Sequence, residues 1–237
     1  MAERRPKVVV LSGAGMSADS GIKTFRDSDG LWEGHHVEEV ATPEGFQENP
    51  AKVLRFYNER RQNIRHAKPN AGHRALADLE SDYDVVIITQ NIDDLHERAG
   101  SNHVIHLHGE IFKAQSTQNP HLVVDLGERD IHIGDIGEDG AQLRPHVVWF
   151  GEPVPKIMEA AAEVADADII LVIGTSMVVY PAAGLVDYAP HDAELYVVNP
   201  DISTMAERNR KVETIAEGAA EGVPPLVARL RQRAHHG

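Results

Sequence analysis

A glycine-rich turn near the amino terminus is the first segment whose residue types could do chemistry. Residues 13–21 read Gly-Ala-Gly-Met-Ser-Ala-Asp-Ser-Gly directly after an apolar run. Glycines at 13 and 15 permit a tight turn, and the backbone amides after it can hold a pyrophosphate. Phe25 and Arg26 add an aromatic ring and a guanidinium suited to a ribose or phosphate. An ordinary strand-to-helix turn beside a surface arginine is the alternative, because the third glycine falls at 21 and the spacing G-x-G-x-x-G is not matched.

A second polar segment, Gln90-Asn91-Ile92-Asp93, ends another apolar run. Polar side chains at the carboxyl end of a buried strand lie where open α/β sheets bind ligands. Amides and a carboxylate suit ribose hydroxyls and a carboxamide. A helix N-cap at Asn91 or Asp93 would explain the same residues.

The third segment is His106-Leu107-His108-Gly109. A histidine of nearly neutral charge at a strand end can accept a proton from a hydroxyl, which predicts a general base at His108. A hydrogen-bonded structural histidine is the alternative. His103, His106 and His108 also suggest a metal site, but no carboxylate or cysteine completes an evident ligand set, so we expect no metal.

The elements that must position these segments follow from the apolar patterns. Short apolar runs predict strands buried on both faces of a parallel sheet at residues 8–11, 85–89, 169–173 and 195–198. Amphipathic patterns predict helices at residues 50–65, 71–79, 156–165 and 226–233. Their alternation predicts an α/β fold, a doubly wound parallel Rossmann-like sheet with a small inserted module.

Composition excludes several classes of function. The 237 residues include no cysteine, which excludes disulfides, thiolate zinc sites and cysteine nucleophiles. The 37 acidic and 23 basic residues give a formal net charge of −14, which argues against nucleic-acid binding. Neither a signal-peptide core nor an 18-residue apolar run is present, so we expect a cytoplasmic protein without membrane contact.

Taken in this order, the three segments resemble the sirtuin family of NAD-dependent protein lysine deacylases. The resemblance continues through Arg-Pro-His-Val-Val-Trp-Phe-Gly-Glu at 144–152, Gly174-Thr175-Ser176 and Asn199-Pro200-Asp201, and covers nearly the whole chain. It implies NAD as a co-substrate and acyl-lysine proteins or peptides as partners. It also implies that each turnover releases nicotinamide and O-acyl-ADP-ribose.

The same resemblance implies roles for individual residues. His108 would be the general base, and the catalytic Asn91 and Asp93 would position nicotinamide and its ribose. The substrate peptide would add as a strand along an extended edge at 148–152, through Val148, Phe150, Gly151 and Glu152, although an ordinary buried strand is the alternative there. The implied cofactor-binding residues are Gly13, Ala14, Gly15, Ser17, Phe25, Arg26, Gln90, Asn91, Ile92, Asp93, Gly174, Thr175, Ser176, Asn199, Pro200, Asp201 and Ala220.

Tyr57 and Arg60 are three residues apart, so on a helix they share a face and can reach one ligand. They match the Tyr-x-x-Arg signature of the sirtuin class that removes succinyl and malonyl groups. By that resemblance, Arg60 would bind the acyl carboxylate and the Tyr57 hydroxyl would donate a further hydrogen bond. A solvated helix face is the alternative, since other arginines surround Arg60.

One segment departs from the family pattern. Residues 113–144 stand where most sirtuins carry four zinc-binding cysteines, so we expect no zinc. We expect one catalytic domain over 1–237, with 24–68 as the cofactor-binding loop and the helical part of the small module, and 113–144 as its insert. Strand pieces at 121–125 and 130–133 would pack it through Leu122, Val123, Val124, Leu126, Ile131, Ile133 and Ile136.

Three other functions remain open from the sequence. The enzyme could be mainly a deacetylase of the same family. It could be a module that binds NAD or ADP-ribose without turnover, although the joint presence of His108, Asn91 and Asp93 favours catalysis. ADP-ribosyl transfer to protein is a third possibility, whereas the missing G-x-G-x-x-G spacing disfavours a nicotinamide oxidoreductase.

Overall fold

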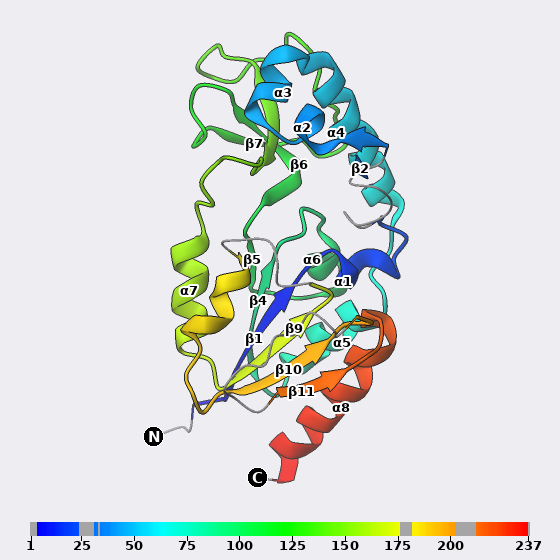
Figure 1. The fold of residues 1–237 in the computed structure, drawn as a ribbon, viewed down its shortest axis with the longest axis vertical. Coiled ribbons are helices and arrows are strands. Elements are labelled where there is room, and N and C mark those ends of the chain that lie inside the picture. The colour runs from blue at the N-terminus through cyan, green and yellow to red at the C-terminus, as the bar shows by residue number, and fades with distance from the viewer. Residues whose placement is uncertain (1–3, 24–30, 33, 176–181, 202–211, 237) are drawn as a thin grey trace.

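The computed structural model describes residues 4–23, 31–32, 34–175, 182–201 and 212–236. Its main sheet has six parallel strands in the order β11-β10-β9-β1-β4-β5 (Figure 1). The strands are β1 (Lys7–Ser12), β4 (Asp84–Thr89), β5 (Val104–His106), β9 (Ile169–Ile173), β10 (Glu194–Val198) and β11 (Val212–Ile215). The four strands and the fold class predicted from the apolar runs are thereby confirmed.

Both faces of this sheet are covered because alternate residues of each strand point to opposite sides. Val8 and Val10 pack with α5 (Ala71–Leu79) and α8 (Ala219–His236), whereas Val9 and Leu11 pack with α7 (Ile157–Ala165) and the 3-10 helix η1 (Ala182–Tyr188). All six residues of β1 are buried, as expected for a central parallel strand. Two shorter helices, α1 (Gly15–Ala18) and α6 (Leu95–Ala99), follow β1 and β4.

Helix α8 begins seven residues before the predicted start at 226. Pro224 and Pro225 come directly before that predicted start, and a proline inside a helix removes an amide donor and usually interrupts the helix. In the structure both prolines lie inside α8. Ala219 and Val223 before them are buried in the core with α5, and this packing outweighs the missing amide donors.

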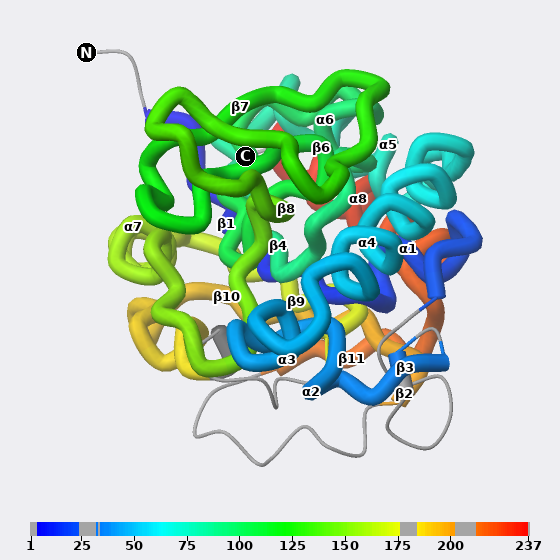
Figure 2. Tube along the Cα trace, turned by 90° about the horizontal axis from the view of Figure 1, so that it is seen from above, coloured from blue at the N-terminus to red at the C-terminus, as the bar shows by residue number. Residues whose placement is uncertain are grey.

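A second layer lies above the main sheet in Figure 1 and therefore in front of it in Figure 2, which is seen from above. It contains an antiparallel sheet in the order β7-β6-β8 and the helices that pack on it. Asn49 accepts a hydrogen bond from the Lys52 amide (3.0 Å) and Pro50 occupies the first turn, so the longest of these helices begins where capping rules predict. The elements of this second layer are β2 (Leu31–Trp32), β3 (His35–His36), α2 (Val37–Val40), α3 (Pro43–Glu48), α4 (Pro50–His66), β6 (Gly109–Ser116), β7 (Val123–Asp125) and β8 (Leu143–Val147).

The insert is held differently from the sequence prediction. No strand forms at residues 130–133, Ile133 is 59% exposed and Ile136 is 62% exposed, so their predicted packing is wrong. Val123 is also exposed (39%), whereas Leu126 and Ile131 are buried as predicted. Alternating apolar residues suggested that these strand pieces pack the insert, but here tertiary contacts decide the conformation.

Polar side chains of α4 anchor this insert. Asn58 accepts a hydrogen bond from the Ile131 amide (3.1 Å) and donates one to the Ile131 carbonyl (2.9 Å). Arg61, with 0% exposure, donates to the Ile111 carbonyl (2.8 Å) and to Asn58 Oδ1 (2.7 Å), and it lies 3.4 Å from Asp130. Because a buried guanidinium must be paired to be tolerated, these contacts tie the insert to α4.

Among the helices in the part of the chain that the structure describes, none is long and apolar enough to cross a membrane.

Candidate active site

The carboxyl ends of the central strands meet at one edge of the sheet. Ser12 pairs with Thr89 on one side and with Ile173 on the other, and Ile173 pairs with Val198. The residues after these strand ends, which include the glycine turn and Gln90, therefore share this edge. From β1 the chain passes to β4 and β5 on one side and then returns to β9 on the other side, so the edge is also the topological switch point where open α/β sheets bind ligands.

The glycine turn packs tightly against the end of β9. Gly13 N donates to the Ile173 carbonyl (3.0 Å), and Gly15 N donates to the Gly174 carbonyl (2.9 Å). A Cβ atom on Gly13 would lie 2.7 Å from Thr175 Cβ, and one on Gly15 would lie 2.7 Å from Gly174 Cα. Both glycines are therefore required by close contact between the turn and the segment after β9.

Ser17 joins the glycine turn to the segment after β4. Its hydroxyl donates to Asp93 Oδ2 (2.9 Å) and accepts from Asn91 Nδ2 (3.1 Å). Asp93 is only 4% exposed, and burial raises the pKa of its carboxyl although the Leu95 amide and Ser17 hydroxyl act in the opposite direction. The hydrogen bond from Leu95 N to Asp93 (3.1 Å) is a helix-capping contact, so capping and ligand binding are compatible at this residue.

His108 lies next to this segment in a defined tautomer. Its Nδ1 is 3.0 Å from the Gln90 carbonyl, which can only accept, so Nδ1 carries the proton and Nε2 keeps its lone pair. Burial lowers the pKa of His108 below its usual value, and the hydrogen bond to Gln90 offsets this only in part. His108 is therefore neutral at pH 7 and suited to accept a proton at Nε2.

His106 holds the neighbouring peptide group and was not predicted to do so. Its Nδ1 donates to the Asn91 carbonyl (3.0 Å), and its Nε2 lies 2.7 Å from Glu97 Oε1. Burial alone would lower the pKa of His106, but the hydrogen bond and charge of Glu97 outweigh it and raise that pKa. His106 and His108 thus bind two successive carbonyls, those of Asn91 and Gln90. Among the described residues, no group of three or more His, Asp or Glu side chains could hold a metal ion.

The far end of the edge collects most of the remaining predicted cofactor residues. Gln90 Nε2 donates to Thr175 Oγ1 (3.0 Å), and Gly174 N donates to the Val198 carbonyl (2.9 Å). Asn199 donates to the Asp201 carbonyl (2.8 Å), and Ala220 N donates to Asp19 Oδ2 (3.0 Å). Three predicted site residues, Phe25, Arg26 and Ser176, lie outside the described residues.

The segment after β8 lies directly beside His108. Val148 N donates to the His108 carbonyl (2.9 Å), and Phe150 N donates to the Ala41 carbonyl (2.9 Å). β8 ends at Val147, and residues 150–151 form a turn closed by the bond from Glu152 N to the Trp149 carbonyl (3.0 Å). The prediction that 148–152 is one extended edge is therefore wrong for its second half, where Gly151 adopts a φ of 89° that a strand excludes.

Tyr57 and Arg60 lie on α4 near this segment. Tyr57 is 1% exposed, so the alternative of a solvated helix face is wrong for this residue. Trp149 Nε1 donates to the Tyr57 hydroxyl oxygen (3.0 Å), and the Arg60 guanidinium lies 4.6 Å from the centre of the Trp32 ring. Trp32 in turn meets the Tyr57 ring edge-on, with centroids 6.1 Å apart. The Tyr57 and Arg60 side chains therefore both contact Trp32. We call the rings of Trp32, Tyr57 and Trp149 the aromatic wall.

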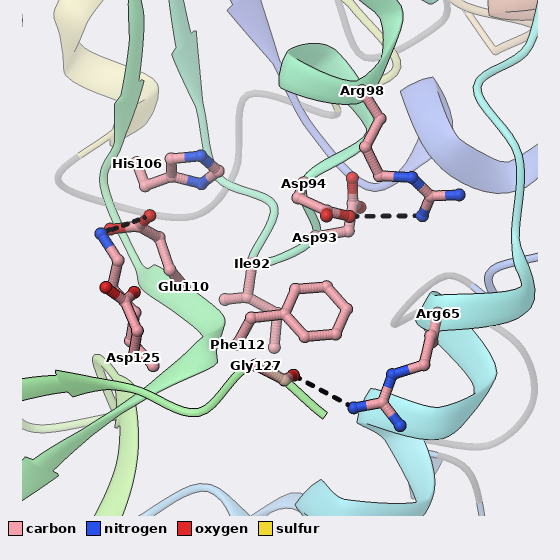
Figure 3. A pocket seen from close by; sticks show the side chains of 11 residues that line it. Arg65, Ile92, Asp93, Asp94, Arg98, His106, Glu110, Phe112, Asp125 and Gly127 are labelled. Carbon is pink, nitrogen blue, oxygen red and sulfur yellow. Dashed lines mark hydrogen bonds and ion pairs between the residues drawn. The ribbon is translucent and has the colours of Figure 1, made fainter. Parts of the chain in front are cut away.

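A cavity of about 550 Å³ lies behind the segment after β4 (Figure 3). Ile92 and Asp93 line it, but His108, Tyr57 and Arg60 do not. Two ion pairs line it, since Arg98 lies 3.4 Å from Asp94 and Lys113 lies 2.9 Å from Glu110, whereas Arg65 donates to the Gly127 carbonyl (3.3 Å). The cavity is separate from the aromatic wall, because Trp32, Tyr57 and Trp149 do not line it.

Comparison with known proteins identifies the family. A model of the Sir2 family matches residues 13–181. The chain belongs to the Sir2 family. An NAD-dependent protein deacylase of Bacteroides thetaiotaomicron is 52% identical over 224 residues, which cover 92% of this chain and 95% of that protein. One from Helicobacter pylori is 50% identical over 227 residues, covering 96% and 98%. The resemblance to sirtuins found in the sequence is confirmed.

Solved structures of Sir2 homologues share the fold of this family member. A mutant homologue in complex with ADP-ribose superposes with a TM-score of 0.86 at 38% identity, covering 98% of this chain and 95% of that one. A Sir2 homologue in complex with NAD superposes with a TM-score of 0.83 at 38% identity, covering 97% and 91%. Unlike sirtuins with a four-cysteine zinc site, this chain contains no cysteine.

Proposed function

We propose that this protein is an NAD-dependent lysine deacylase that removes succinyl and malonyl groups from proteins or peptides, with slower removal of acetyl groups. The general activity, NAD-dependent protein deacylation, is supported by the names of its relatives. The acidic acyl preference is supported by one observation above others. The His108 backbone carbonyl accepts a hydrogen bond from Val148 N, and the indole of the next residue, Trp149, donates one to the Tyr57 hydroxyl. These two hydrogen bonds connect the proposed base to the proposed acyl pocket.

The residues at the carboxyl edge of the sheet fit NAD. Asp93 is a buried carboxylate aligned by Ser17, and Asn91 shares that hydroxyl, which provides fixed polar groups for a ribose and a carboxamide. When bound, NAD supplies an activated ribose carbon from which nicotinamide departs and to which the acyl oxygen adds. We assign phosphate and ribose contacts to the turn with Gly13, Ala14 and Gly15, and adenosine contacts to the far end of the edge, which includes Gly174, Thr175, Asn199, Pro200, Asp201 and Ala220.

His108 would move the proton that the reaction requires. Its neutral imidazole accepts a proton from a ribose hydroxyl at Nε2, while Nδ1 remains bonded to Gln90. The deeply placed Asn91 and Asp93 hold the nicotinamide end in register with this atom. Positioning of this kind supplies much of the rate enhancement when no protein nucleophile is involved.

Arg60 and Tyr57 would recognise the acidic end of the acyl group. A guanidinium can bind a carboxylate through two parallel hydrogen bonds, and a protonated phenol donates one more. Burial raises the pKa of Tyr57 above its usual value, so the phenol stays protonated at neutral pH. The peptide backbone would lie beside the catalytic histidine, against Val148 and the turn that contains Phe150, Gly151 and Glu152.

Mass spectrometry of acyl peptides tests this function. Acetyl-, succinyl- and malonyl-lysine peptides of one sequence are incubated with the protein, with and without NAD. We expect NAD-dependent loss of succinyl and malonyl groups, faster than loss of acetyl, with one nicotinamide released per acyl group. Faster acetyl removal would instead identify a deacetylase, and binding of NAD without nicotinamide release would identify a non-catalytic module.

The pH dependence of deacylation reports the state of His108. The neutral form is the active base, so activity falls as pH drops through its pKa, and burial lowers the pKa of His108 below 6.5. We therefore expect the acid limb of kcat/KM to have its midpoint below pH 6.5. The profile is measured on an acetyl peptide, whose acyl group does not titrate. An acid limb centred above pH 7 would contradict the assignment.

A further inference from the structure

The indole of Trp149 is placed to control the Tyr57 hydroxyl. Its Nε1 donates a hydrogen bond to the Tyr57 oxygen at 3.0 Å. Trp149 is 2% exposed and Tyr57 is 1% exposed, so the bond is shielded from competing water. A buried hydrogen bond of this kind restricts rotation of the two side chains, because breaking it would leave a buried N–H donor with neither a protein partner nor water.

The direction of this bond matters for acyl recognition. An indole N–H can only donate, so the phenol oxygen must accept in this pair. The Tyr57 proton is then directed to a different acceptor. Since the phenol is protonated at neutral pH, Tyr57 is presented as a donor, which suits a carboxylate oxygen and gives no benefit to an acetyl methyl group.

Two nearby residues, Arg144 and Glu152, hold the Trp149 side chain in place. The Arg144 guanidinium stacks 3.4 Å from the centre of the indole ring and donates to Glu152 through two bonds of 2.6 and 3.0 Å. Glu152 also accepts from the Trp149 amide (2.8 Å). Arg144 is 7% exposed, so these charge-assisted contacts hold the ring firmly.

We propose that Trp149 is a positioning residue for acyl selectivity: its indole N–H sets the Tyr57 hydroxyl as a donor toward an acyl carboxylate. The inference rests on the proposed function, because it deepens the role of the pocket formed by Tyr57 and Arg60. It assigns part of the preference for acidic acyl groups to a residue that acts through the Tyr57 hydroxyl.

The substitution Trp149→Phe tests the role of the N–H while it retains an aromatic ring against Phe46 and Tyr57. The readout is the ratio of kcat/KM for succinyl and acetyl peptides. We expect this ratio to fall about threefold to tenfold, mainly through KM for the succinyl peptide, as for the loss of one hydrogen bond. Combined with Tyr57→Phe, the same substitution should have no further effect on the ratio.

The matched control is Phe46→Leu. Phe46 packs against Trp149 with ring centroids 5.2 Å apart, so this variant loosens the indole but keeps its N–H. It should affect both substrates alike, and circular dichroism and thermal melting of each variant verify folding.

The outcomes separate this inference from the proposed function. Absence of succinyl removal by the unsubstituted enzyme would overturn the proposed function, and the inference with it. If the unsubstituted enzyme removes succinyl groups, an unchanged ratio in Trp149→Phe would overturn the inference alone. A ratio that still falls when Tyr57 is already phenylalanine would also overturn it, because the effect would not pass through the Tyr57 hydroxyl.

Discussion

Replacing His108 by tyrosine is expected to reduce removal of every acyl group by about two to four orders of magnitude, the usual contribution of a general base. The imidazole is neutral, its Nδ1 is bonded to Gln90, and Nε2 is left to accept a proton. A phenol has no lone pair of comparable basicity at neutral pH. Steady-state assays with succinyl and acetyl peptides measure the loss, which should be similar for both.

Two controls make the His108 result specific. His103 is exposed on the same stretch of chain, so His103→Tyr should leave both activities unchanged. NAD binding by His108→Tyr, measured by calorimetry, should remain detectable because the glycine turn and Asp93 are untouched. A variant that keeps more than about a tenth of the activity would show that another group serves as the base.

Replacing Arg60 by methionine is expected to lower kcat/KM for succinyl peptides about tenfold to a hundredfold, with a much smaller effect on acetyl peptides. Each charge-assisted hydrogen bond contributes about 1.5–3 kcal/mol, and only the acidic acyl group makes such bonds. Methionine can fill much of the volume above Trp32, whose ring centre lies 4.6 Å from the guanidinium. In Arg60→Met, kcat/KM for malonyl peptides should fall by a similar factor to kcat/KM for succinyl peptides.

Arg55 provides the matched control for this variant. It lies on the same helix but is exposed, so Arg55→Met removes a positive charge from α4 without altering the aromatic wall. That variant should keep the succinyl-to-acetyl ratio of the unsubstituted enzyme. Equal losses for both substrates in Arg60→Met would remove Arg60 from acyl recognition and leave it a structural role against Trp32.

Much of the fold was predictable because its signals are local. The apolar run at 169–173 predicted β9, which is Ile169–Ile173, and the pattern at 71–79 predicted α5, which is Ala71–Leu79. The insert was less predictable. Ile131 and Ile133 have equal strand preference, yet only Ile131 is buried: its side chain packs in an apolar cluster with Leu54, and Asn58, far away in the chain, binds both of its backbone polar groups.

The candidate site divides in the same way. Gly13, Gln90 and His108 were found because each follows an apolar run at the carboxyl end of a strand, where α/β sheets bind ligands. His106 was set aside as a poor metal ligand. Its bond to Asn91 and ion pair with Glu97 require the fold to bring three separate segments together.

The sequence by itself determined the strands, the main helices, the absence of cysteine and the family to which the chain belongs. These follow from residue types, spacing and order, which are properties of the chain alone. Only the tertiary structure decided that Trp149 meets Tyr57, 92 residues away, and that Arg144 and Glu152 hold the indole in place. Such contacts depend on how α4 packs against the end of β8, and no local periodicity encodes that packing.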